Sequence, residues 1–251
     1  SVMPTYVITG CSSGIGLDMV QALAARGDKV FALVRCKTGS KSGADEISKV
    51  EGDVTIVEGI DVAKDDVGDA LAASSLAGIQ IDCLVNNSGI AGAGADFGAQ
   101  KLGTITMDTM RETFEVNTLG PLRVTKALMG QMTSPGGKVV VISTGIGSIG
   151  DNGSGGMYAY RSSKAAVNMV TRSLAADLKK DGLGIAVAAI APGFVATDFG
   201  GSVEKMEGWG AKPVGQATKG ILDTIDAMTV ENTGRFIMVP TDGGEPKEFP
   251  W

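Results

Sequence analysis

The sequence predicts a single α/β domain built on a doubly wound sheet of seven parallel strands. Short apolar runs alternate with stretches of helical periodicity, which is the pattern of repeated βαβ units. A glycine-rich turn joins the first apolar run to the first helical stretch, as is typical of doubly wound folds. No Pro/Ser-rich or charged linker interrupts the chain, so residues 1–251 are expected to form one domain.

The charge balance argues against two classes of partner. The formal net charge is −6, the sequence pI is about 4.8, and no cluster of Lys or Arg stands out. We therefore expect neither nucleic acid nor an anionic membrane as a partner. Glycine accounts for 37 residues, about twice ordinary usage. It gathers in loops, which suits close approach of the backbone to phosphates or a planar cofactor.

Cysteine and histidine usage excludes several catalytic schemes. Cys11, Cys36 and Cys83 are odd in number and lack metal-ligand spacing, so we expect neither a disulfide framework nor a metal site. A reducing, cytoplasmic location is the simplest expectation. The chain has no histidine, which excludes Ser-His-Asp and Cys-His mechanisms. No apolar run is long enough to span a bilayer, and residues 1–4 are too short for a signal peptide.

The first strand, predicted over residues 5–9, runs into Gly10, Gly14 and Gly16 and then into a helix that continues to about Arg26. The glycines would allow a tight turn, room for a pyrophosphate and close packing of helix on strand, while the helix N-terminus faces the phosphates. This is the start of a Rossmann-type domain. The spacing Gly-x3-Gly-x-Gly differs from the commoner fingerprint, and a turn without a ligand is the alternative.

The second strand, residues 29–34, ends at Arg35, 19 residues after Gly16. An acidic residue at this distance would bind the ribose 2′-hydroxyl of NAD, whereas a basic one accommodates the 2′-phosphate of NADP. Arg35, with Lys37 and Lys41 close behind, favours NADP and makes NAD less likely as the cofactor. The alternative is an arginine at a solvated strand edge.

Two further strands are predicted over residues 54–60 and 81–85, with a helix over residues 64–76 between them. Asp61 follows the first of these strands, and Asn-Asn-Ser-Gly at 86–89 follows the second. The small residues of 91–103 are expected to form a surface loop.

A long helix is predicted over residues 107–132, with Pro121 inside it. Because proline has no N–H, the carbonyl of Asn117 loses its intrahelical partner and is free to hold a water or another group. A simple kink explains the same pattern.

The fifth strand, residues 138–142, ends at Ser143 and Thr144, and a glycine-dense segment over 145–156 follows. The next helix carries Tyr160 and Lys164, which share one face because they lie four residues apart. Tyrosine has a pKa of about 10, and a nearby cation lowers it, which permits proton transfer near neutral pH. A solvated pair without a joint role is the alternative.

The C-terminal part is predicted to add a sixth strand over 185–190, a helix over 216–228 and a seventh strand over 235–239. The sixth strand is closed by Pro192-Gly193. Residues 194–214 contain large apolar side chains among glycines, most of them between 198 and 213, and are expected to form a substrate lid.

These motifs, in this order, resemble those of the short-chain dehydrogenases/reductases over essentially the whole chain. The matching residues are Thr9-Gly10-x3-Gly14-Ile15-Gly16, Asp61, Asn86-Asn87-Ser88-Gly89, Asn117, Tyr160-x3-Lys164 and Pro192-Gly193. The segment from Gly147 to Arg161 is most similar to a subgroup that includes sniffer-type carbonyl reductases and bacterial C-factor proteins.

The resemblance implies a role for each matching residue. Tyr160 would exchange a proton with the substrate oxygen, Lys164 would lower the pKa of Tyr160 and hold the nicotinamide ribose, and Asn117 would position a water. The implied cofactor contacts are Gly10, Ser12, Ser13, Gly14, Ile15, Gly16, Arg35, Asp61, Val62, Asn87, Ser88, Gly89, Tyr160, Lys164, Pro192, Gly193, Val195 and Thr197. Members of the family often form homodimers or homotetramers, and we expect the same here.

The chain departs from the family pattern at the catalytic serine. Thr144, after Ser143, occupies that place, and the interval from it to Tyr160 is longer than usual. Thr144 is the first candidate for the catalytic hydroxyl, Ser143 the second, and Ser148 the third if the glycine-rich segment folds back.

The leading functional hypothesis is an NADP-dependent reductase of a ketone, aldehyde or quinone. A nucleotide-binding signalling or scaffold protein with weak catalysis is the alternative from another class, suggested by Thr144 and the likeness to C-factor. A 3-oxoacyl carrier-protein reductase is the alternative among enzymes, disfavoured by the acidic charge of the chain.

Overall fold

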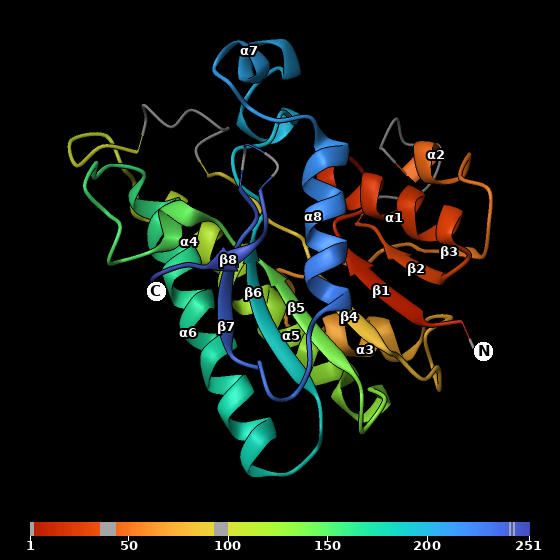
Figure 1. Cartoon of the computed structure of the whole chain (residues 1–251). Helices are drawn as coiled ribbons and strands as arrows, with labels where there is room; N and C mark the ends of the chain where they lie inside the picture. Colours follow the sequence, from red (N-terminus) through yellow and green to blue (C-terminus); the bar gives the residue numbers. More distant parts are fainter. Residues whose placement is uncertain (1–2, 36–43, 93–99, 241, 243) are drawn as a thin grey trace.

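A central sheet with helices on both faces forms the molecule (Figure 1). The structure is a computed structural model that describes residues 3–35, 44–92, 100–240, 242 and 244–251. Within these residues eight strands form one sheet in the order β3-β2-β1-β4-β5-β6-β7-β8. The strands are β1 Thr5–Thr9, β2 Lys29–Leu33, β3 Val54–Val57, β4 Cys83–Asn86, β5 Lys138–Ile142, β6 Ala186–Ala191, β7 Arg235–Met238 and β8 Lys247–Glu248.

The seven parallel strands predicted from the sequence are confirmed. The eighth strand, β8, pairs antiparallel with β7 through Ile237–Glu248 and Met238–Lys247. A two-residue strand of charged side chains has no apolar alternation, so the sequence pattern could not reveal it.

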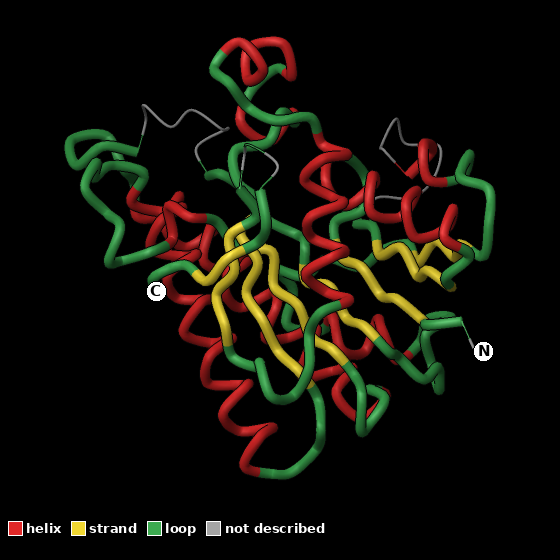
Figure 2. Tube along the Cα trace, in the orientation of Figure 1, coloured by secondary structure: helices red, strands yellow, loops and turns green. Residues whose placement is uncertain are grey.

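Two layers of helices cover the sheet (Figure 2). The helices are α1 Gly14–Arg26, α2 Ala44–Ile47, α3 Val67–Ala72, α4 Met107–Phe114, α5 Gly120–Leu128, α6 Tyr158–Lys180, α7 Val203–Gly208 and α8 Val214–Asp226. Helix α1 packs beside α8 in one layer, and α3, α5 and α6 lie in the other.

The alternation of residues along the strands produces a hydrophobic core on each face of the sheet. In β1, Ile8 packs toward α1 and α8, while its neighbour Val7 packs toward α3, α5 and α6. Successive strand side chains point to opposite faces, so a sheet covered on both sides needs continuous apolar strands. This is why the strands read as unbroken apolar runs rather than as alternating ones.

The order in which successive strands are added to the sheet reverses between the adjacent parallel strands β1 and β4. Strands β1 to β3 extend to one side of this point and β4 to β7 to the other. In open α/β sheets, ligands bind beyond the carboxyl ends of the strands at this switch point. The glycine-rich turn after β1 and residues 86–89 of β4 and its following loop meet there.

The helix predicted over 107–132 is interrupted. Helix α4 leads into a π-helical turn over Glu115–Leu119, then α5 begins, and a short 3-10 turn over Met129–Gln131 follows. Pro121 at the start of α5 has no N–H to donate, which is one cause of such breaks. The predicted helix is therefore confirmed in extent from Met107 to Gln131, but it is not uniformly α-helical.

Other boundaries shift by a few residues. The third strand stops at Val57, three residues before the predicted end, and the helix predicted over 64–76 covers only Val67–Ala72. Ile81 makes an isolated bridge with Met132 instead of starting β4.

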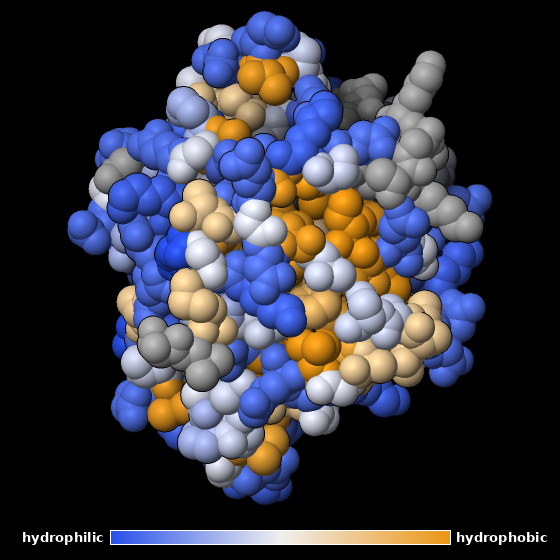
Figure 3. Space-filling model, turned by 90° about the vertical axis from the view of Figure 1, so that its right-hand side faces the viewer, coloured by the Kyte–Doolittle hydropathy of each residue, from blue (hydrophilic) through white to orange (hydrophobic). Residues whose placement is uncertain are grey.

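The surface on the side of α1 and β3 is mixed in character. Apolar residues gather near the middle of this face and hydrophilic residues surround them (Figure 3). None of the helices in the described part of the chain combines the length and apolar character needed to cross a bilayer.

Candidate active site

A cleft of about 1050 Å³ lies at the carboxyl ends of the strands. All of the cofactor contacts implied by the sequence line it, from Gly10 and Ser12 to Val195 and Thr197. Among the candidate catalytic residues, Ser143, Thr144, Tyr160 and Lys164 also line it, whereas Asn117 and Ser148 do not. Predicted contacts as far apart along the chain as Gly10 and Thr197 therefore share one cavity.

Two glycines of the glycine-rich turn pack so closely against neighbouring residues that a side chain would not fit. A Cβ on Gly16 would collide with the carbonyl oxygen of Gly10 and lie 2.6 Å from Asn87 Nδ2. Gly10 has φ of +69°, and a Cβ there would lie 2.8 Å from the Cα of Ser88. The turn is thus packed directly on the loop after β4, which only glycine permits.

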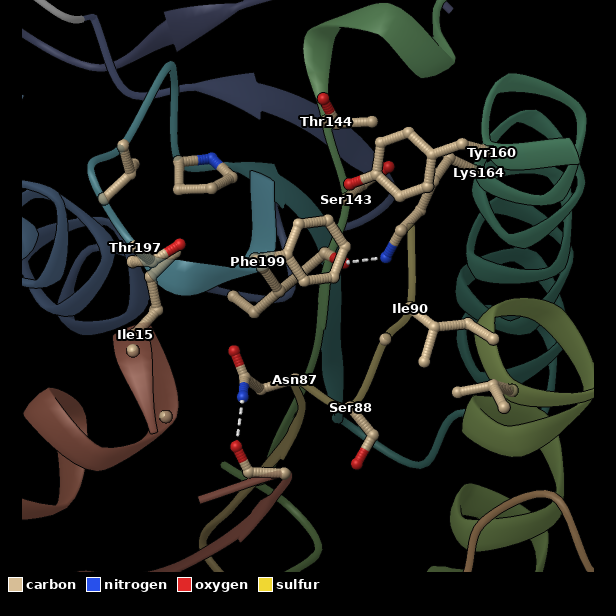
Figure 4. A pocket seen from close by; sticks show the side chains of 18 of the residues that line it. Ile15, Asn87, Ser88, Ile90, Ser143, Thr144, Tyr160, Lys164, Thr197 and Phe199 are labelled. Atoms are coloured by element: carbon tan, nitrogen blue, oxygen red, sulfur yellow. Dashed lines mark hydrogen bonds between the residues drawn. The ribbon is translucent and has the colours of Figure 1, made fainter. Parts of the chain in front are cut away.

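Polar contacts hold the two loops together. Thr9 Oγ1 accepts hydrogen bonds from the backbone N–H groups of Asn87 at 3.0 Å and Ser88 at 2.9 Å. Asn87 Nδ2 donates in return to the carbonyls of Thr9 and Gly10 (Figure 4). The Asn87 side chain therefore acts as a brace between β1 and β4, a role that the sequence pattern did not reveal.

Helix α1 presents its N-terminus to the cleft. Its N-cap residue Ser13 makes no side-chain capping hydrogen bond, and Gly14, Ile15 and Gly16 of the first turn line the cavity. Backbone N–H groups at a helix N-terminus and the positive end of the helix dipole favour an anion. The cavity, the glycine turn and this helix end together fit a dinucleotide with its pyrophosphate.

Arg35 and Asp61 lie at the end of the cleft formed by β2 and β3. Arg35 follows β2 and its side chain is exposed, while Asp61 Oδ1 accepts from the N–H of Ala63 at 3.1 Å. The predicted partners Lys37 and Lys41 lie outside the described residues, as does Cys36. Arg35 therefore places a positively charged side chain at this end of the cleft.

Three hydroxyls were candidates for the catalytic position, and the structure separates them. Thr144 lines the cleft beside Tyr160, and its hydroxyl acts to lower the pKa of the phenol. Ser143 is buried and donates to Asn168 Oδ1 at 2.6 Å. Ser148 is also buried, accepts from the N–H of Asp151 and donates to the carbonyl of Trp251 at 3.3 Å. Thr144 is therefore the candidate that both lines the cleft and acts on the pKa of the phenol.

The C-terminal residues hold the glycine-rich segment that contains Ser148. The Trp251 ring stacks on Phe236 with centroids 5.3 Å apart, and its carbonyl accepts from the N–H of Gly150 at 3.0 Å. Phe249 lines the cleft. These long-range contacts fold Ser148 away from Tyr160, which the sequence could not show.

Tyr160 and Lys164 point from α6 into the same cleft, as their spacing predicts (Figure 4). Lys164 Nζ donates to the carbonyl of Ile142 at 2.8 Å and lies 6.0 Å from the centroid of the Tyr160 ring. Burial lowers the pKa of Lys164 to about 8. The ammonium form still dominates at pH 7.

The pKa of Tyr160 differs from the sequence expectation. Burial raises the pKa of the phenol above its ordinary value, and the hydrogen bond with Thr144 opposes this shift. The expectation that Lys164 lowers the pKa of Tyr160 is therefore not met in this structure. The ammonium of Lys164 is directed to the Ile142 carbonyl, and desolvation disfavours the charged form of both side chains.

Asn117 contributes through its side chain. Its Oδ1 accepts from the N–H of Ile90, and its Nδ2 donates to the carbonyl of Ile90, both at 2.8 Å. Nδ2 also donates to Ser163 Oγ at 3.1 Å. Asn117, which is fully buried, thus joins the loop after β4 to α6.

Several residues of the segment predicted as a lid line the cleft. It contains a 3-10 turn over Asp198–Gly200 and helix α7, and α7 is capped by the Ser202 hydroxyl. The Phe199 ring lies 5.7 Å from the Tyr160 ring at an interplanar angle of 53°. Large side chains that the site prediction omitted also line the cavity: Ile146, Met157, Phe194, Phe199, Met206, Trp209, Met238 and Phe249.

The described residues contain no group of three acidic or cysteine side chains arranged as metal ligands would be.

A Rossmann-type sheet with a glycine cradle at its switch point and a Tyr-Lys pair across the cleft defines a class of nicotinamide-dependent oxidoreductase. The short chain dehydrogenase family model matches residues 4–208. The chain therefore belongs to the short-chain dehydrogenase/reductase family.

Curated relatives and solved structures agree with this assignment. A 1-hydroxy-2-glutathionyl-2-methyl-3-butene dehydrogenase of Rhodococcus sp. (strain AD45) is 34% identical over 93% of this chain and 96% of its own length. The C-signal protein of Myxococcus xanthus is 36% identical over 68% of this chain and 93% of its own.

Among solved structures, the carbonyl reductase Sniffer of D. melanogaster superimposes with a TM-score of 0.80 and 28% identity, covering 100% of both chains. A carbonyl reductase from Pseudomonas aeruginosa PAO1 in complex with NADP gives 0.79 and 27%, covering 100% of both chains. The predicted likeness to sniffer-type and C-factor-like proteins is thereby confirmed.

Proposed function

We propose that the chain is an NADP-dependent reductase of carbonyl compounds in which Tyr160 supplies the proton. The observation that carries this proposal is that Tyr160, Lys164 and Thr144 line the same cleft as the glycine-rich turn. A bound nicotinamide would supply the hydride. The chain itself has to bind the substrate, hold its oxygen and deliver a proton to it.

The state of Tyr160 suits the direction of reduction. Because burial raises the pKa of the phenol, it stays protonated in the free enzyme and can act as a proton donor. The Thr144 hydroxyl both donates and accepts hydrogen bonds, so it can hold the substrate oxygen beside the phenol. The methyl group of Thr144 narrows the space around that oxygen.

The Lys164 ammonium would assist this proton transfer without touching the substrate. Its ammonium adjoins Gly89, where a Cβ would lie 3.6 Å from Nζ, and so reaches the loop on which the cofactor is expected to rest. A cation there stabilises the phenolate left after proton donation, even though the free phenol has a raised pKa.

The side chains that line the cleft favour a small apolar substrate. The charged side chains among its described lining residues are Arg35, Asp61, Asp151, Lys164 and Asp198. Apart from Lys164, the charges outside the predicted adenosine side are those of Asp151 and Asp198, which repel an anion. A neutral aromatic or aliphatic carbonyl thus suits the site better than a carboxylate-bearing conjugate such as the one named for the Rhodococcus relative. Residues 194–214 would act as the lid over it.

A panel of carbonyl compounds tests the proposal. Oxidation of NADPH, followed at the nicotinamide absorbance band, should proceed with neutral ketones, aldehydes or quinones and more slowly with matched carboxylates. Bound NADPH without turnover of any compound would contradict a catalytic function.

The choice of NADP is supported by Arg35 and by the NADP complex of the Pseudomonas carbonyl reductase. Replacing Arg35 by aspartate is expected to weaken NADPH binding by about 10- to 100-fold, because a hydrogen bond to a charged group contributes about 1.5–3 kcal/mol. NADH affinity should be kept, since aspartate can accept from the ribose hydroxyls. Titration of both nucleotides by fluorescence measures the ratio.

The control is Arg111→Asp, the same change at an exposed arginine of α4 that pairs with Asp108 outside the cleft. It should leave both affinities unchanged. An unaltered NADPH-to-NADH ratio in Arg35→Asp would show that another group selects the nucleotide. Assembly into a homodimer or homotetramer and a cytoplasmic location stay predictions.

A further inference from the structure

At the start of α6, the helix that carries Tyr160, the preceding residue offers no side chain that caps the first N–H groups. Its N-cap residue, Met157, has φ of 50° and makes no side-chain capping hydrogen bond. Gly155 and Gly156 before it also have positive φ and carry no side chain. The first N–H groups of a helix have no intrahelical acceptor, so α6 needs acceptors from elsewhere.

Gln100 supplies these acceptors from the segment between β4 and α4. Its side-chain Oε1 accepts from the N–H of Tyr160 at 3.1 Å, and its backbone carbonyl accepts from the N–H of Tyr158 at 3.5 Å. The loop containing Gln100 was expected to be a surface connection, yet its side chain is 0% exposed. The expectation was wrong for this residue, because a partner 60 positions away buries it.

The amide of Gln100 is satisfied on both sides. Its Nε2 donates to the carbonyl of Ala91 at 2.6 Å while its Oε1 accepts from Tyr160. One neighbour offers only an acceptor and the other only a donor, so the amide has a single orientation. A fully buried polar side chain with these contacts joins the start of α6 to the loop after β4.

The carbonyl side of Tyr160 is tied to the same loop. Ser163 Oγ donates to the carbonyl of Tyr160 at 2.8 Å and accepts from Asn117 Nδ2. Asn117 in turn holds both backbone groups of Ile90. Both peptide groups that flank the Tyr160 Cα are therefore connected, through Gln100 and Asn117, to the adjacent residues Ile90 and Ala91.

We propose that Gln100 is a positioning residue for the proton donor. By capping the N–H of Tyr160 and holding Ala91, it sets the distance between the phenol and the loop after β4, which borders the cleft. This inference rests on the proposed reductase function, because positioning is measured through the proton transfer by Tyr160. Gln100 itself does not line the cleft and would not touch the substrate.

The variant Gln100→Leu keeps the approximate volume and removes both side-chain hydrogen bonds. We expect kcat for carbonyl reduction to fall by about 10²-fold, the effect of a misplacement of about 1 Å. The KM for NADPH should change little, because the glycine cradle and Arg35 lie elsewhere in the cleft. A loss divided equally between kcat and the KM for NADPH would contradict a positioning role.

Asn232 offers a matched control. Its side-chain amide also bridges a donor and an acceptor near a helix end, accepting from the N–H of Thr229 at 2.8 Å and donating to the carbonyl of Ala227 at 2.9 Å. It lies beyond α8, outside the cleft lining. Asn232→Leu should lower thermal stability without changing kcat, and an equal kcat loss in both variants would overturn the inference.

Gln100→Glu tests the hydrogen-bond geometry directly. A protonated carboxyl can accept from Tyr160 and donate to Ala91, whereas a carboxylate cannot donate. Burial raises the pKa of such a carboxyl, as it raises the pKa of the Tyr160 phenol. Relative to the wild type at each pH, Gln100→Glu should recover activity as the pH falls, and Gln100→Leu should not. A parallel pH profile for both variants would contradict the inference.

Hydrogen exchange separates this inference from the proposed function. The Tyr160 amide should be strongly protected in the wild type and at least tenfold less so in Gln100→Leu, which has no side-chain acceptor for this N–H. If the Tyr160 amide loses protection in the variant but no carbonyl compound is turned over, the reductase function is rejected and the capping role of Gln100 is retained. An unprotected Tyr160 amide in the active wild type would reject the cap and keep the function.

Discussion

Tyr160→Phe is expected to lower kcat for carbonyl reduction by about 10²- to 10⁴-fold, the usual contribution of a positioned general acid. Phenylalanine keeps the ring contact with Phe199 and the packing of α6, so the variant should fold normally. Only the hydroxyl that Thr144 contacts is lost. Steady-state oxidation of NADPH and NADPH titration together measure the effect, with affinity for NADPH retained.

Tyr158→Phe provides the comparison on the same helix. Tyr158 is 42% exposed and does not line the cleft, so removal of its hydroxyl should leave kcat near the wild-type value. If Tyr160→Phe retained most of its activity while Thr144→Val lost it, the proton would have to come from the threonine side of the cleft. That result would reverse the roles proposed for the two hydroxyls.

Gly16→Ala is expected to destroy the cofactor cradle. The added methyl group would meet the carbonyl of Gly10 and the amide of Asn87, which braces β1 against β4. Overpacking of this kind costs about 1–3 kcal/mol of folding free energy. Because Gly10 and Asn87 both line the cleft, we also expect NADPH affinity to fall at least about tenfold, equivalent to 1.4 kcal/mol. Thermal unfolding with and without NADPH measures both effects.

Gly215→Ala is the matched control for this substitution. Gly215 lies in the first turn of α8, and a Cβ there would meet nothing within 4 Å. Alanine is favoured over glycine in a helix by up to about 1 kcal/mol, so this variant should be as stable as the wild type or more stable. Equal behaviour of the two alanine variants would show that the turn tolerates a side chain at Gly16 and would contradict the steric role of this glycine.

The two sets of residues that these variants probe come from opposite sides of one cleft. Gly16 belongs to the helix that follows β1, whereas Tyr160 belongs to the helix that follows β5. The switch in strand order between β1 and β4 brings their ends together. A loss of NADPH binding in one variant and a loss of proton transfer in the other would show that the cleft combines the two functions.

The sequence by itself determined the seven parallel strands, the glycine turn and the shared face of Tyr160 and Lys164. Each of these follows from a pattern within a few residues: apolar runs, glycines that no other residue can replace, and the four-residue spacing of a helix. The order of the motifs also indicated the family, and all of them except Asn117 follow a predicted strand or lie at the start of a predicted helix.

Only the tertiary structure decided which hydroxyl lies against Tyr160, how Lys164 is directed and where Gln100 goes. Ser148 is drawn to the carbonyl of Trp251, 103 positions away, and Gln100 reaches the N–H of Tyr160 across 60 positions. The pKa of Tyr160 likewise depends on its burial under the packed chain and not on its neighbours in sequence. Contacts of this range depend on how the sheet, the C-terminal residues and the loops pack together, and no local periodicity encodes them.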